Sequence, residues 1–259
     1  MFEIYHFNET DILSFALMMV RVSSCLVLMP IFGSRLIPPP AKILLSLVVS
    51  MVLFPVMKHN FVTPASWSDD MILLVMREAF LGLFMGFLTR LLFLGVEVAG
   101  QILSFTMGFS AVSLLNPTFG EQNTLMEQFE TTLATLLFLA INGHHMLFEA
   151  IYRSFELAPL GVLSVNVKAF ASVTLLVSEI FTIGVKLAGP MIAVILFLNI
   201  ALGIVGRAVP QINVFVISFP VNILVGLFVF MVSIPLLLTV FETDAVHIGG
   251  EILTFIKDF

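Results

Sequence analysis

The chain changes direction at the stretch GIVGRAVPQIN (Gly203 to Asn213), which separates the apolar runs 191–202 and 214–238. This stretch holds one charged residue, Arg207, and one proline, Pro210. Proline lacks an N–H group and disfavours helical backbone in the residue before it, while the two glycines loosen the approach to the turn. The pattern predicts two long helices joined by a tight turn, which is a helical hairpin in lipid.

The composition is that of an integral membrane protein. Of the 259 residues, 59% are hydrophobic and 11% are charged, and the mean hydropathy is +1.13. Soluble domains carry about 25% charged residues. The 27 Phe stand against one Trp and two Tyr, so few aromatic anchors mark the two membrane interfaces. We therefore expect a membrane protein with an unusual fit to the bilayer.

Charge and residue usage exclude several function classes. The net charge of −6 gives no basic face for nucleic acid. Cys25 is the only cysteine, and none of the five histidines has a second ligand at helical spacing, so we predict no metal and no other cofactor. Nucleotide-binding loops and hydrolase motifs are missing from the sequence, which predicts that the chain is not an enzyme.

Apolar runs predict an all-α membrane protein of about six long, partly kinked helices. The runs cover residues 12–32, 41–57, 71–95, 129–142, 170–202 and 214–241. A bilayer crossing needs about 20 apolar residues, so some runs are short and others are long and interrupted by charge. Because residues 1–11 are acidic and the loops near Arg35 and Arg207 are basic, six crossings would place both termini outside the cytoplasm.

Several charged residues lie inside or next to these runs, namely Arg21, Arg77, Glu78, Arg90, Glu97, Glu179 and Lys186. Each would cost at least ~2.5–3.5 kcal/mol facing lipid at mid-depth, so we expect most of them to face protein, water or a headgroup level. Gly82 and Gly86 form a GxxxG motif that permits close backbone approach. The helices are therefore expected to pack against partners.

Glu179 and Lys186 lie seven positions apart, about 10.5 Å along one helical face. They cannot pair directly with each other. One interpretation is an ion or proton relay; the other is interhelical pairing with groups such as Arg90 or Glu97 or with a neighbouring subunit. A relay needs several converging carboxylates or histidines, and the chain offers only scattered ones, so interhelical pairing is favoured.

The segment from Phe105 to Asn123 is too apolar for solvent and too broken for a lipid-facing helix. Non-helical backbone at membrane depth is tolerated only where it is buried in protein or lines a cavity. Gly108, the Asn116-Pro117 pair and Gly120 are turn formers within it. The segment is either a plug folded into a channel or a re-entrant packing element.

Two further polar segments have structural and functional interpretations. The Asn142-Gly143-His144-His145 segment follows an apolar run, and because adjacent residues on a helix project about 100° apart, a helix-terminal role is favoured over a shared metal. In the hairpin turn, Arg207, Gln211 and Asn213 either bind an acidic loop of a partner or anchor the turn at the membrane surface. Both alternatives stay open for the turn.

Specific motifs run along nearly the whole chain. They are Arg21 with PIFG (30–33), MGFS (107–110) with NP (116–117), LFLAINGHH (137–145), SF (154–155) with PLG (159–161), GVKLAGP (184–190), NIALGIVGRAVPQINVF (199–215), FP (219–220) and GL (226–227). This set closely resembles the FliR family of the flagellar type III export gate, together with its virulence-secretion counterpart SctT.

The resemblance implies a core subunit of the gate through which unfolded flagellar proteins leave the cytoplasm. One such chain would join FliP and FliQ subunits, with FlhB around them, in the bacterial inner membrane at the flagellar basal body, as a multi-pass assembly projecting toward the periplasm. Residues 1–165 would form a FliP-like region and residues 166–259 a FliQ-like hairpin with a C-terminal tail. The rivals are an SctT-type virulence gate subunit and a stand-alone ion-coupled transporter, although inverted repeats are not visible.

The resemblance also implies roles for individual residues. An apolar plug would close the pore with residues from about 106 to 122, namely Met107, Phe109, Leu114, Leu115, Asn116, Pro117 and Phe119. The tip of the hairpin would face the cytoplasm with Arg207, Pro210, Gln211 and Asn213. Membrane lipid and unfolded export substrates would complete the set of partners.

Overall fold

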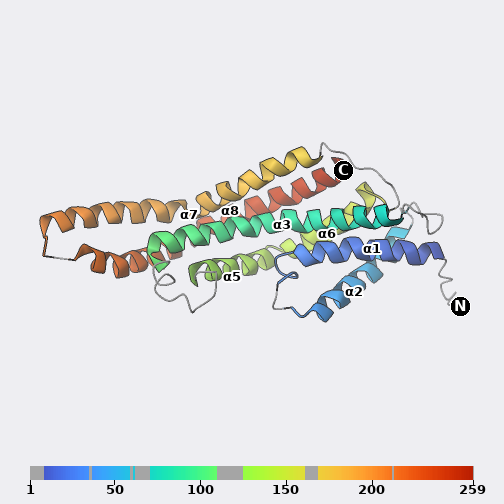
Figure 1. Cartoon of the computed structure of the whole chain (residues 1–259), viewed down its shortest axis with the longest axis horizontal. Coiled ribbons are helices and arrows are strands. Elements are labelled where there is room, and N and C mark those ends of the chain that lie inside the picture. Colours follow the sequence, from blue (N-terminus) through green and yellow to red (C-terminus); the bar gives the residue numbers. More distant parts are fainter. Residues whose placement is uncertain are drawn as a thin grey trace. The chain divides into compact units, whose positions relative to one another are not determined.

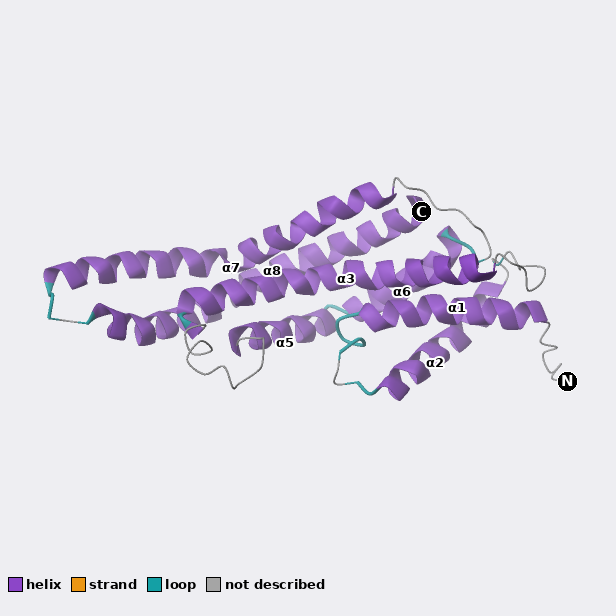
Figure 2. Cartoon of the chain, in the orientation of Figure 1, coloured by secondary structure: helices purple, strands orange, loops and turns teal. Residues whose placement is uncertain are grey.

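The structure, a computed structural model, describes residues 9–34, 37–58, 61, 71–109, 125–160, 169–211 and 213–258. Across these residues the chain forms helices and no strand (Figure 2). The helices are α1 (Glu9–Leu28), α2 (Pro39–Met57), α3 (Met71–Met107), α5 (Leu125–Ala140), α6 (Gly143–Leu157), α7 (Ala169–Ala208) and α8 (Val214–Asp258). The predicted all-α fold is confirmed.

Most of these helices are long and apolar enough to cross a membrane. Among the described residues five meet this condition, in α1, α2, α3, α7 and α8, and a sixth would result if the broken pair α5 and α6 forms one span. The chain is therefore a multi-pass membrane protein. α3, α7 and α8, with 37, 40 and 45 residues, are much longer than the ~20 residues that a crossing requires.

The predicted hairpin is confirmed, because α7 ends at Ala208 and α8 begins at Val214 (Figure 1). The turn is shorter than predicted, since Gly203 and Gly206 lie inside α7. A Cβ atom at Gly206 would collide with the side chain of Val214, so this glycine lets the start of α8 pack against the end of α7. Pro210 follows the end of the helix, as its effect on the preceding residue requires.

Helix α6 was not among the predicted apolar runs. It begins after Asn142, whose φ of 58° lies in the left-handed region that asparagine tolerates. One face is buried, and on the other Arg153 pairs with Glu149 at 2.6 Å. The buried face consists of Gly143, Leu147, Ala150, Ile151, Ser154 and Phe155. A search for continuous apolar runs overlooks such an amphipathic helix, whereas a search for helical periodicity finds it.

Helix α8 continues to Asp258, whereas the predicted run ended at residue 241. Apolar residues recur at helical spacing through the added stretch. The buried ones are Ala245, Ile248, Ile252, Phe255 and Ile256. Phe255 stacks on Phe84 of α3 with the ring centroids 3.6 Å apart, so packing extends the helix where the sequence becomes more polar.

The chain forms two compact units that do not follow the order of the sequence. Unit 1 comprises Met1–Leu91, Asn142–Leu176 and His247–Phe259, and unit 2 comprises Leu92–Ile141 and Val177–Val246. Helices α3, α7 and α8 contribute residues to both units. The division into a FliP-like region (residues 1–165) and a FliQ-like region (residues 166–259) rests on resemblance to those proteins and not on the compact units. It stays a prediction.

Small residues set the spacing of helices inside each unit. In unit 1, Gly82 of α3 faces α1, and a Cβ atom at Gly86 would lie 2.5 Å from the carbonyl oxygen of Cys25. In unit 2, a Cβ atom at Gly184 of α7 would lie 2.7 Å from a methyl group of Val98. The predicted close approach at the GxxxG motif of α3 is confirmed. Helix α2 also lies beside α1 in unit 1 (Figure 1).

Candidate functional site

The predicted plug segment starts at the end of α3, in unit 2. Met107 is fully buried against α8, where a Cβ atom at Gly226 would lie 2.7 Å from its terminal methyl group. Gly108 has a φ of +88°, a left-handed conformation that favours glycine. A Cβ atom at Gly108 would lie 3.1 Å from the ring of Phe219, also on α8. The root of the segment is therefore fixed on α8, and half-buried Phe109 follows it.

Most of the predicted plug lies outside the described residues. This applies to Leu114, Leu115, Asn116, Pro117 and Phe119. The structure gives the position of the root, and the closing of a pore by residues 106–122 stays a prediction.

The predicted tip residues Arg207, Pro210, Gln211 and Asn213 are all exposed at the turn between α7 and α8. Arg207 lies in the last turn of α7, where a cation interacts favourably with the helix dipole. Asn213 starts α8, because its side-chain oxygen accepts a hydrogen bond from the N–H of Val216 at 3.4 Å. Asn213 therefore has a structural role, while Arg207 and Gln211 present their side chains to the surroundings.

Of the two charged residues singled out on α7, Lys186 has an interhelical partner that the sequence did not indicate. Nζ of Lys186 lies 3.8 Å from Oδ1 of Asp244 on α8. The Lys186 side chain is half-exposed, so the pair contributes at most about 1 kcal/mol. Glu179 lies on α7, and its side chain is outside the described region of the structure.

A group of buried charges in unit 1, which we call the buried arginine cluster, consists of Arg21, Arg77 and Glu78. Nε of Arg21 donates a hydrogen bond to Oε2 of Glu78 at 2.5 Å. Nη1 of Arg77 donates to Oε1 of the same carboxylate at 2.8 Å. All three side chains are at most 3% exposed. The expectation that charges within the runs face protein is confirmed for these three residues.

The buried arginine cluster holds the end of α6. Both terminal nitrogens of Arg21 donate to backbone carbonyls there, to Ser154 at 2.9 Å and to Ala158 at 2.9 Å. The Arg21 guanidinium also lies 4.4 Å from the centre of the Phe155 ring. The last carbonyls of a helix have no partners within it and carry partial negative charge. These carbonyl groups therefore offset the net positive charge that remains when two arginines share the carboxylate of Glu78.

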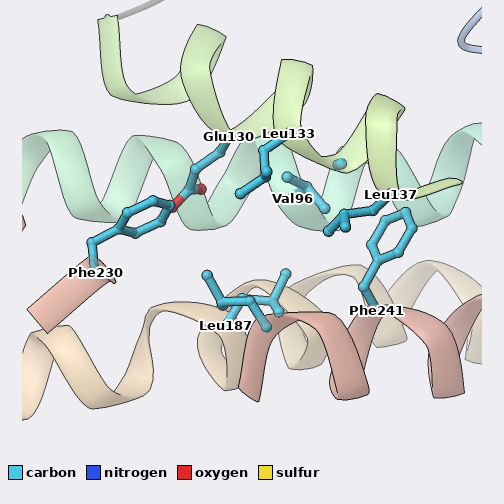
Figure 3. Close-up of a pocket in the computed structure, with 9 residues that line it drawn as sticks. Val96, Glu130, Leu133, Leu137, Leu187, Phe230 and Phe241 are labelled. Carbon is cyan, nitrogen blue, oxygen red and sulfur yellow. The ribbon is translucent and has the colours of Figure 1, made fainter. Parts of the chain in front are cut away.

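Unit 2 contains a small pocket between its helices (Figure 3). Glu130 of α5 is its one polar lining residue, and neither carboxylate oxygen has a hydrogen-bond partner within the described structure. We call this hollow the Glu130 pocket. It is lined by Val96, Glu130, Leu133, Ala134, Leu137, Leu187, Phe230, Leu237 and Phe241. Sequence analysis did not single out Glu130, although it is a carboxylate inside an apolar run.

The two histidines near the start of α6 form no metal site with other ligands in the described residues, where no group of three or more His, Cys, Asp or Glu comes together. Their rings lie 4.2 Å apart. The carbonyl of Asn142 accepts a hydrogen bond from the N–H of His145 at 2.9 Å. The segment thus starts a helix through its backbone.

Comparison with known proteins gives a family and several relatives. Residues 12–247 match the model of the bacterial export proteins, family 1. The flagellar biosynthetic protein FliR of Bacillus subtilis is 32% identical over 88% of this chain and 88% of the relative. The protein of the same name from Escherichia coli is 30% identical over 93% of this chain and 90% of the relative. That of Aquifex aeolicus is 29% identical over 89% and 88%.

Proposed function

The chain belongs to the bacterial export proteins, family 1, and on this basis we propose that it is a core, non-enzymatic subunit of the flagellar type III protein export gate. Its flagellar relatives support a component of flagellar export rather than of virulence secretion. In this role one copy joins FliP and FliQ subunits in the inner membrane at the basal body, with FlhB around them. Unfolded flagellar proteins pass through the channel that these subunits form.

The exposed apolar surface of α7 and α8 is the observation that carries the proposal. Only 17% of the apolar stretch of α7 and 22% of that of α8 are buried, against 67% for α3. At 1.5 Å per residue, the apolar span of α8, Val216–Lys257 with 42 residues, extends about 63 Å, twice the ~30 Å hydrocarbon layer, and a tilt of ~40° does not remove the excess. Lipid alone therefore cannot cover α8 over its whole length, and neighbouring subunits are needed.

Residues 106–122 are proposed to plug the channel. The fixed root supports this role, because buried Met107 and left-handed Gly108 hold the start of the segment on α8. Phe109, Leu114, Leu115 and Phe119 supply the apolar bulk that would exclude water and ions, and Asn116-Pro117 supplies a turn within it. Export would require displacement of the segment by substrate.

Deletion of residues 110–116 tests the plug. We expect the assembled complex to leak ions across the membrane, because the deletion removes the apolar segment and keeps its root at Met107 and Gly108. A second variant replaces 110–116 with a Gly-Ser stretch of equal length and separates the loss of apolar bulk from the loss of length. The measurement is single-channel conductance of the purified complex in planar bilayers. Unchanged conductance of both variants in intact complexes would remove the plug and leave an architectural subunit.

A further inference from the structure

The Glu130 pocket places a buried carboxylate in an apolar surround (Figure 3). Glu130 is 5% exposed, and both of its carboxylate oxygens lack a hydrogen-bond partner among the described residues. Figure 3 shows its carboxyl group directed toward Phe230 of α8. Side chains of α3, α5, α7 and α8 form the remaining wall.

The surroundings of Glu130 raise the free-energy cost of a negative charge on its carboxyl group. Glu127, one turn earlier on α5, is also buried, and the amide of Gln101 reaches it at 3.5 Å. A second carboxylate adds negative charge where the pocket has no positively charged lining residue. Burying a charge without a partner costs several kcal/mol or more, whereas a charged partner with good geometry offsets much of that cost. A buried carboxyl group avoids this cost by remaining neutral until a cation enters beside it, and a cation is the partner that the pocket lacks.

The walls and the size define what kind of cation fits. Leu133, Leu137 and Leu187 suit methylene groups, and the rings of Phe230 and Phe241 attract a cation over their faces. The cavity has a volume of about 30 Å³, which is room for roughly two water molecules. An ammonium group and the methylene beside it fill this space, whereas a planar guanidinium is larger. One carboxylate is too few for Ca²⁺, which takes 6–8 oxygen ligands.

We propose that the Glu130 pocket receives the ammonium tip of a lysine side chain from another protein chain of the export assembly. Three lysines in the described part of this chain have other partners: Lys42 donates to the carbonyl of Gly33 at 2.9 Å, Lys58 pairs with Asp11 at 2.7 Å, and Lys186 lies 3.8 Å from Asp244. Glu130 thus supplies the one polar contact within a lining that is otherwise apolar. The source of the lysine rests on the proposed function, but the ammonium site itself does not.

The first experiment uses the full chain alone in detergent micelles, with n-butylammonium chloride as the probe. We expect the midpoint of thermal unfolding to rise by roughly 2–4 °C once the amine exceeds its dissociation constant about fivefold. Glu130→Gln should lose this rise, and the matched control Glu127→Gln, which keeps the lining carboxylate, should retain it. No rise in the unaltered chain, an equal rise in Glu130→Gln, or an equal rise with uncharged n-butanol would overturn the ammonium site.

The second experiment repeats the titration with the purified export complex. We expect no rise, because a lysine of another subunit already fills the pocket, and we expect Glu130→Gln to lower the temperature at which this chain leaves the complex while Glu127→Gln does not. A rise as large as that of the free chain would show an unfilled pocket and overturn the lysine. If no complex with export subunits forms, the proposed function fails, whereas the titration of the free chain still reports on the ammonium site.

Discussion

The buried arginine cluster of unit 1 and the Glu130 pocket of unit 2 differ in whether the buried carboxyl group has partners. In unit 1, Glu78 has two arginine partners, and the carbonyls at the end of α6 compensate the charge that remains. In unit 2, the carboxylate of Glu130 is equally hidden and has no hydrogen-bond partner within the described residues. The first arrangement balances its charges within one chain. The second requires a group from outside, as does the exposed apolar surface of the hairpin.

Removing one carboxylate from each unit tests this contrast and has the largest expected effect. Glu78→Gln keeps the shape of the side chain but leaves two buried guanidinium groups without a countercharge, so we expect a loss of about 3–5 kcal/mol in the free energy of unfolding. Glu130→Gln replaces a buried carboxyl group that has no hydrogen-bond partner in the described part of the chain by a neutral amide of the same shape, so the free energy of unfolding should stay the same or rise. The measurement is denaturant unfolding of the full chain in micelles. Equal losses in the two variants would contradict the contrast.

Glycine contacts give a second test, with an intermediate effect. A Cβ atom at Gly82 of unit 1 would collide with the backbone carbonyl of Arg21, which cannot move without shifting α1. A Cβ atom at Gly226 of unit 2 would come closest to Cγ, Sδ and Cε of the flexible Met107 side chain rather than to backbone. Gly82→Ala should therefore cost about 1–3 kcal/mol, and Gly226→Ala less than ~1 kcal/mol.

The control for this pair is Gly250→Ala on α8, because a Cβ atom at Gly250 would have no atom of another residue within 4 Å. It should leave the free energy of unfolding unchanged or raise it slightly, since alanine is the better helix former. The same denaturant unfolding measures all three variants. If Gly226→Ala costs as much as Gly82→Ala, the end of Met107 is held as firmly as backbone and the root of the plug is more rigid than we infer.

The sequence predicts the features that depend on a residue and its immediate neighbours in the chain. Pro210 ends a helix through its own ring, and Gly82 with Gly86 permits close packing through the lack of a side chain, so hairpin and close approach are visible in the sequence. Helix α6 is overlooked because its apolar residues are interrupted by Glu149 and Arg153. Its helical periodicity is nevertheless present in the sequence.

The contacts that complete each unit could not be predicted, because they join residues far apart in the chain. Arg21 binds Glu78 across 57 positions and Ser154 across 133. Lys186 meets Asp244, because the register between α7 and α8 decides which charges face each other. Glu130 is an ordinary carboxylate in the sequence, and only the packing of four helices around it makes it buried. The residue types show which charged groups need partners, and only the folded structure shows which partners they meet.

The hairpin tip provides the test with the smallest effect on stability. Arg207 is exposed at the end of α7, so Arg207→Glu should change the free energy of unfolding by no more than about 1 kcal/mol, most of it from the helix dipole. If the tip contacts an acidic group of a partner, the reversed charge should nevertheless reduce flagellar export, and Arg207→Lys should preserve it. Swimming in soft agar measures export, and the amount of chain in the membrane controls for folding. Normal motility with Arg207→Glu would show that Arg207 only anchors the turn, and docking by unit 2 would then have to rest on its apolar faces and on Glu130.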